Sequence, residues 1–287
     1  LTGAAKAWEQ ALQVAVEEGD FAAVAQSRAG LGLVHAAHGE AAMAADGLAQ
    51  ALELLPRGDP NWPRVAQALA SARLEMGRVE EAEHLWSQLE ELGRATQMSS
   101  VVAEALLGRG MAAMLRGNIK SGRLALEDAE LRLRDQVRPL QLSRVLLELS
   151  ELALSQGRLL ESVERALEAE RVAREIPRVV YCIHALGLVA QARAALGWAS
   201  DSLQAARDAA TLARARGRVN TVPELLAAAS VARALCASGE HREGLVLVAA
   251  PSIREFVGIQ DSVRVVWAVR ARALSVSQPE EAIEAAK

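Results

Sequence analysis

Small and large apolar residues return along the chain at fixed distances from a series of glycines. Successive glycines of this series are 38, 40, 40, 40 and 42 residues apart, and they are Gly39, Gly77, Gly117, Gly157, Gly197 and Gly239. The residue seven positions before each glycine and the residue five positions after it are always Gly, Ala or Ser. The ninth residue after each glycine is apolar in every copy. A period of this length predicts stacked helical hairpins.

Each repeat is therefore predicted to be a helix, a glycine turn and a second helix. The glycine supplies the left-handed conformation that ends the first helix, and the small residues let the two helices cross closely. The full repeats are predicted at residues 21–58, 60–97, 99–137, 139–176, 178–218 and 222–258, with partial repeats at 1–20 and 261–287. Neither end shows the polar capping helix that helical repeat arrays need for solubility. We expect residues 1–287 to form a single helical solenoid domain, as a fragment of a longer protein.

Composition supports an all-α fold and narrows the function. Ala, Leu, Arg and Glu dominate, and only 3% of the residues are aromatic, which favours helices. The net charge of −4 is unlike that of a stand-alone nucleic-acid binder. No apolar run of 18 residues and no signal peptide is present, so we expect a cytoplasmic location without membrane contact. Cys182 and Cys236 fall inside helical patterns and are expected to be buried thiols.

The first full repeat resembles the tetratricopeptide repeat family. The matching residues are Leu31, Gly32, Gly39, Ala44, Leu48, Ala51 and Pro56. This resemblance implies an all-α, right-handed superhelical solenoid of antiparallel helix pairs, with about seven units. The period is near 40 residues rather than the usual 34, and His35 stands where the family motif has a tyrosine. The longer period is similar to that of arrays in large bacterial signalling and regulatory proteins.

Motifs for catalysis, cofactors or metals are weak or lacking. His35 and His38 share a helix face, but with only Glu40 nearby we expect a packed His35 and a solvated His38 rather than a metal site. Gly108 to Ala113 matches a dinucleotide-binding fingerprint, but it falls within a predicted helix instead of after a strand. No phosphate-binding loop or nucleophile motif occurs. We expect a chain that is not an enzyme and uses no cofactor.

Two clusters of arginines, at residues 132–138 and 214–218, fall near the ends of predicted second helices. Cations at these ends complement the helix dipole and the last carbonyl groups. We interpret the clusters as helix caps, with phosphate binding as the alternative.

The resemblance implies that the first helices of the pairs line a concave groove that holds a partner peptide or helix. Residues ten, six and three positions before each turn glycine, with their flanking polar residues, are the predicted lining. The candidates for this groove are Arg64, Gln67, Ser71, Leu107, Met111, Met114, Arg144, Leu147, Glu151, His184, Gln191 and Arg233. Flexible methionines suit a peptide groove, although Met111 and Met114 equally suit the core.

Two functional hypotheses follow. The first is a non-catalytic interaction, scaffold or sensor module of a larger bacterial regulatory protein. Its partner would be a protein or peptide, including another domain of the parent chain, and it would not contact nucleic acid directly. The alternative is a receptor for a small inducer, as the similarity to bacterial transcription regulators and signalling ATPases implies. In that case Arg144, His184 and Arg233 would contact the ligand.

Overall fold

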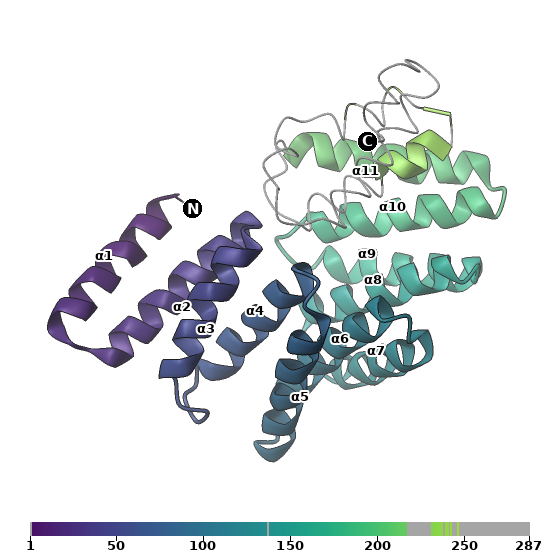
Figure 1. Ribbon diagram of the computed structural model, residues 1–287. Helices are drawn as coiled ribbons and strands as arrows, with labels where there is room; N and C mark the ends of the chain where they lie inside the picture. Colours follow the sequence, from purple (N-terminus) through teal and green to yellow (C-terminus); the bar gives the residue numbers. More distant parts are fainter. Residues whose placement is uncertain are drawn as a thin grey trace. The chain divides into compact units, whose positions relative to one another are not determined.

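The computed structural model describes residues 2–136, 138–216, 231–237, 239–240, 242 and 246. All regular structure within these residues is helical (Figure 1). The chain divides into two compact units, Leu1–Arg132 and Leu133–Lys287, which we call unit 1 and unit 2. Each unit is described by itself.

Unit 1 is built from antiparallel helix pairs. Its helices are α1 (Thr2–Glu18), α2 (Phe21–His38), α3 (Ala41–Leu54), α4 (Trp62–Glu75), α5 (Val79–Ala95), α6 (Ser99–Leu115) and most of α7 (Ile119–Arg134). Helix α2 packs against α1 and α3, and α5 packs against α4 and α6. The first helices of successive pairs also touch, since α4 contacts both α2 and α6.

Unit 2 continues the same pattern. It contains α8 (Pro139–Ser155), α9 (Leu159–Ala173), α10 (Val180–Ala195) and α11 (Ala199–Arg216), and residues 231–237 are also helical. Helix α9 packs against both α8 and α10, and α10 packs against α11. The first helices α8 and α10 contact each other directly.

The predicted glycine turns are confirmed. All six glycines of the series have φ between 71° and 88°, in the left-handed region that residues other than glycine rarely adopt. At Gly39, the glycine N–H donates to the carbonyl of Ala36 at 3.1 Å, and the Glu40 N–H donates to the carbonyl of His35 at 3.0 Å. These bonds satisfy carbonyl groups that the end of α2 would otherwise leave unpaired.

Close crossing of the paired helices explains the small residues beside each turn. A Cβ added to Gly32 of α2 would lie 2.6 Å from Cγ of Leu48 in α3, and one added to Gly110 of α6 would lie 2.8 Å from Cγ of Leu126 in α7. Both leucines are fully buried. A larger side chain at either glycine would hold the helix axes apart.

The core of each unit lies between its helices and is made largely of leucine, alanine and valine. Cys182 and Cys236 are both buried, as expected, and are not joined in a disulfide. Among the helices that the structure describes, none is sufficiently long and apolar to cross a membrane.

Candidate functional site

The predicted groove residues all lie on first helices of the pairs. Arg64, Gln67 and Ser71 are on α4, and the three candidates near residue 110 are on α6, all in unit 1. In unit 2 the candidates lie on α8, on α10 and, for Arg233, in the helical segment 231–237. We call the surface that these residues share in each unit its first-helix face.

Two of the predicted lining residues are core residues instead. Leu107 is 2% exposed and Leu147 is 3% exposed, so neither side chain can contact a partner directly. Counting back ten residues from the turn glycine therefore selects a position that points between the helices at these two repeats. Met111 and Met114 are half-buried, so they belong partly to the core and partly to the surface.

A cluster of charged side chains occupies the first-helix face of unit 2. His184 of α10 and Glu151 of α8 form an ion pair, with Nε2 and Oε1 2.6 Å apart. The His184 side chain is 15% exposed, whereas the Glu151 side chain is 46% exposed. Glu148 and Arg233 lie close enough to alter the ionisation of this pair, and Arg144 lies close enough to alter that of Glu148. Four members of this cluster were among the predicted groove residues, namely Arg144, Glu151, His184 and Arg233, whereas Glu148 was not.

The pKa values in this cluster move in opposite directions. The pKa of Glu148 is raised to about 7, mainly by burial and also by the nearby Glu151 carboxylate, against the opposing effects of His184 and Arg144. Burial also acts to raise the pKa of Glu151, but the His184 hydrogen bond and charge outweigh it and lower the pKa. Burial acts to lower the pKa of His184, yet the contact with Glu151 raises it overall. The shifts within the pair therefore favour the charged forms of His184 and Glu151, whereas the Glu148 carboxyl titrates near pH 7.

A sequence signal for Glu148 was present at its repeat position. Nine residues before the turn glycine, two repeats of unit 1 have a glycine, Gly30 and Gly108, whereas this repeat has a carboxylate. An acidic side chain among the leucines of α8 at such a position indicates a polar environment on that face.

The first-helix face of unit 1 is less charged. The side-chain amide of Gln67 in α4 donates to Oε2 of Glu104 in α6 at 3.0 Å, which ties the two first helices together. Ser71 is half-buried beside them, and Arg64 is exposed near the start of α4. These residues are in place for contacts with a partner, but they form no cluster like that of unit 2.

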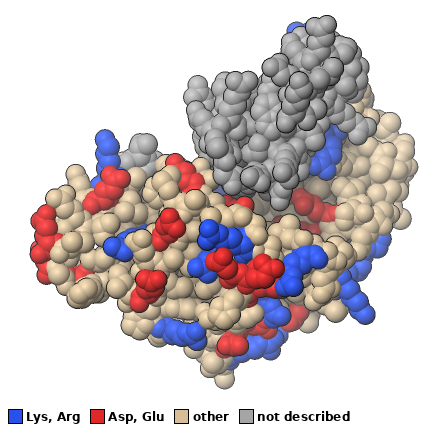
Figure 2. Space-filling model, viewed as in Figure 1, with Lys and Arg blue, Asp and Glu red and all other residues tan. Residues whose placement is uncertain are grey.

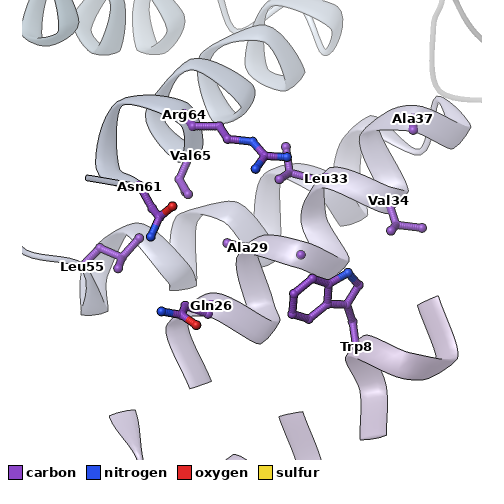
Figure 3. Close-up of a pocket in the computed structure, with 11 residues that line it drawn as sticks. Trp8, Gln26, Ala29, Leu33, Val34, Ala37, Leu55, Asn61, Arg64 and Val65 are labelled. Atoms are coloured by element: carbon purple, nitrogen blue, oxygen red, sulfur yellow. The ribbon is translucent and has the colours of Figure 1, made fainter. Parts of the chain in front are cut away.

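Unit 1 also contains a hollow of about 400 Å³ that the sequence did not reveal (Figure 3). Trp8 of α1 forms one wall, α2 forms the floor, and the start of α4 forms the opposite wall. The lining residues are Trp8, Gln26, Ala29, Gly30, Leu33, Val34, Ala37, Leu55, Asn61, Arg64 and Val65. Of these, only Arg64 was among the predicted groove residues.

Many of the described arginines outside these faces form ion pairs with carboxylates. Glu90, which is nearly buried, binds both Arg94 and Arg109. In the 132–138 cluster, Arg134 binds Glu168 through two hydrogen bonds of 2.7 and 2.9 Å, and Arg132 binds Asp128 at 2.9 Å. Both arginines lie in the last turn of α7, where the sequence predicts cations, and both are paired with carboxylates. The arginine side chains of the 214–218 cluster lie outside the described part of the structure.

Acidic and basic side chains are interspersed on the visible face of the molecule (Figure 2). His35 pairs with Glu40, with Nδ1 and Oε2 2.5 Å apart. The side chains of His35 and His38 are almost equally exposed, at 28% and 27%, so the expected contrast between a packed His35 and a solvated His38 is wrong. Within the described part of the chain, no group of three or more His, Cys, Asp or Glu side chains is placed to hold a metal ion.

The fold matches solved structures, although no family model and no curated protein matches the sequence. The apo form of RapI gives a TM-score of 0.65 at 12% identity, covering 91% of this chain and 90% of RapI. The Rap conjugation gene regulator of plasmid pLS20, in complex with the Phr* peptide, gives 0.64 at 12% identity, covering 94% of this chain and 78% of that one. A signal transduction ATPase from Pyrococcus horikoshii with a tetratricopeptide repeat sensor gives 0.60 at 13% identity, covering 91% and 42%.

These matches define the class of the fold. The chain is an all-α protein of the tetratricopeptide-like helical repeat type, as the resemblance of its first repeat implied. At 12–13% identity the likeness concerns the fold alone.

Proposed function

We propose that the chain is a non-catalytic module that binds a peptide or helix of a protein partner on its first-helix faces. The observation that carries this proposal is the charged cluster of unit 2, made of Arg144, Glu148, Glu151, His184 and Arg233. Three separate helical segments contribute to it, and Glu151 and Arg233 remain exposed. Charged groups gathered on one open face offer oriented partners for a polar peptide.

The comparisons support a peptide as the partner. A Rap protein similar in fold to this chain was solved with the competence and sporulation factor, and the pLS20 Rap regulator was solved with the Phr* peptide. The Pyrococcus horikoshii protein uses a repeat of this type as a sensor. We therefore propose an interaction or sensor role, in the cytoplasm of a bacterium, within a larger regulatory protein. The predicted array of full and partial repeats over residues 1–287 is part of the same proposal.

A peptide selection tests this proposal directly. Peptides from a random displayed library are selected on the whole chain, and the affinity of a selected peptide is measured by fluorescence anisotropy. We expect Glu151→Gln to weaken binding about tenfold, because it removes a charged hydrogen-bond acceptor from the cluster. The matched control is Glu164→Gln, an exposed carboxylate on the second helix α9.

The outcome separates the two functional hypotheses. Equal affinity of wild type, Glu151→Gln and His184→Gln for every selected peptide would contradict peptide binding at this cluster. A melting temperature raised by a metabolite but by no peptide would instead favour the small-inducer hypothesis, since a ligand that binds only the folded state stabilises it. Circular dichroism establishes beforehand that the variants are folded.

A further inference from the structure

The hollow of unit 1 has the size and lining of a side-chain binding site. Its volume of about 400 Å³ exceeds the roughly 150 Å³ that suffices for a benzene ring and lies at the small end of the range of ligand pockets. Room is therefore available for one bulky side chain with part of its backbone, but not for a large cofactor.

The indole of Trp8 packs directly against α2 because Gly30 has no side chain. A Cβ added to Gly30 of α2 would lie 2.4 Å from two carbons of the Trp8 indole, so the ring rests directly on the helix backbone. Trp8 nevertheless remains 38% exposed, and its indole lies beside Ala29 at the edge of the hollow (Figure 3). An aromatic face fixed in this way is a rigid platform for another apolar or aromatic group.

The buried part of the lining is apolar. Ala29, Leu55 and Val65 are buried there, and Leu33 is half-buried. Filling the hollow with a hydrocarbon side chain would remove apolar surface of both partners from water, at about 25 cal/mol for each Å².

The rim of the hollow is polar and offers hydrogen-bonding groups. Arg64 extends its guanidinium across the hollow toward Leu33 (Figure 3). No ion pair joins Arg64 to a carboxylate among the residues that the structure describes, whereas Arg73 on the same helix binds Glu81. Asn61 occupies the N-cap position of α4, yet its side chain makes no capping hydrogen bond. Gln26 is exposed at the opposite edge.

We propose that this hollow binds a bulky apolar side chain of the peptide partner, with an acidic side chain next to it in the peptide bound by Arg64. The guanidinium of Arg64 is the complementary charge for such a carboxylate. The amides of Asn61 and Gln26 both donate and accept, so they suit the N–H and C=O groups of the peptide backbone. The inference rests on the proposed function, since it specifies the peptide that unit 1 would select.

Blocked dipeptides serve as probes. Acetyl-Leu-Glu-amide carries both features, acetyl-Leu-Gln-amide lacks the charge, and acetyl-Ala-Glu-amide lacks the bulky group. The readout is the indole N–H signal of Trp8 in the ¹⁵N–¹H spectrum of the whole chain, which has five tryptophans. Loss of one signal in Trp8→Phe assigns it. We expect acetyl-Leu-Glu-amide to move this signal with a Kd of about 1 mM, a magnitude usual for ligands of this size.

Two variants sharpen the test. Arg64→Gln should weaken acetyl-Leu-Glu-amide about fivefold and leave acetyl-Leu-Gln-amide unchanged, so that both probes bind this variant equally. Ala37→Leu adds a side chain to the hollow and should weaken both leucine probes. Arg178→Gln, an exposed arginine of unit 2, is the control and should change neither.

Four results would overturn the proposal. One is an unmoved Trp8 signal at about 10 mM probe, well above the expected Kd. A second is movement of the Trp198 signal instead of the Trp8 signal when the probe is added. A third is an equal loss of affinity for both leucine probes in Arg64→Gln. The last is a Trp8 signal that shifts on dilution of the chain alone, since a second copy would then fill the hollow. If the probes fail while Glu151→Gln still weakens a selected peptide, only the proposal for the hollow is lost.

Discussion

The two units contain the same helical hairpin, but different residue types lie where its two helices cross. In unit 1 the small residues at the crossing are glycines and alanines, such as Gly32 against Leu48. In unit 2 serines occupy three of these positions: the Ser150 hydroxyl donates to the carbonyl of Ser162 at 2.9 Å, and the Ser202 hydroxyl donates to the carbonyl of Ala190 at 2.8 Å. All three serines are fully buried. The crossing therefore constrains the size of the side chain, while polarity is tolerated where a hydrogen bond is made.

The first-helix faces of the two units also differ in their residue types. Unit 1 has an apolar hollow with Arg64 at its rim, whereas unit 2 gathers three carboxyl and imidazole groups with arginines around them. Residues at the crossing fix the spacing of the helices, and the face beyond them is free to vary. Different binding chemistry can thus be placed on one repeat scaffold, which is why the fold alone does not identify a partner.

The largest expected effect comes from enlarging a crossing residue in unit 1. Ala44 of α3 is fully buried at the crossing with α2, so Ala44→Leu should lower the free energy of unfolding by about 1–3 kcal/mol. Chemical denaturation followed by circular dichroism measures this loss. Ala42→Leu is the matched control, because Ala42 is exposed on the same helix and should have little effect.

Hydrogen exchange locates the damage from the same substitution. Repeats couple mainly to their neighbours, so protection should fall first in α2, α3 and α4. Equal loss of protection in α8 and α10 of unit 2 would contradict this view of the repeat.

A second prediction concerns the charged cluster of unit 2. The folded chain holds a proton on Glu148 up to about pH 7, whereas the unfolded chain releases it near the ordinary pKa of 4.5. Folded molecules therefore bind more protons between these values, and the free energy of unfolding falls as pH rises through that window. Glu148→Gln removes this pH-dependent loss of stability. The variant also removes the negative charge of Glu148, which helps to raise the pKa of His184.

Thermal and denaturant unfolding at two pH values measures the effect. One unit of pKa corresponds to about 1.4 kcal/mol, and we expect the stability of Glu148→Gln relative to wild type to rise by about 1–2 kcal/mol from pH 5 to pH 8. Glu164→Gln on α9 should show no such change. A difference between Glu148→Gln and wild type that stays constant with pH would show that Glu148 ionises normally and that neither burial nor the neighbouring Glu151 raises its pKa.

The repeat could be predicted from sequence because each turn and crossing has a local steric requirement. A positive φ demands glycine at Gly39 and its equivalents, and close helix axes demand a small residue at Gly32. Both requirements recur at every copy, so they appear as a period in a single sequence.

The site was predicted less well because it depends on contacts between repeats. Counting along one helix selected Leu107 and Leu147, which the neighbouring helices bury. It missed Glu148, and it missed Trp8, whose position against α2 depends on the absent side chain of Gly30. Such pairings have no fixed spacing in the sequence, so no periodic signal marks them.

The smallest expected effect returns to the helix crossings. Ser150→Ala removes the donor to Ser162 and should lower the free energy of unfolding by about 1 kcal/mol, measured by urea denaturation. Ser150→Ala/Ser162→Ala converts this crossing to the alanine pair of unit 1, Ala70 and Ala82, both fully buried. Because the double variant leaves no serine without its partner, it should be no less stable than Ser150→Ala. Additive losses in the double variant would mean that the serines stabilise unit 2 separately, and that the crossings of the two units are not interchangeable.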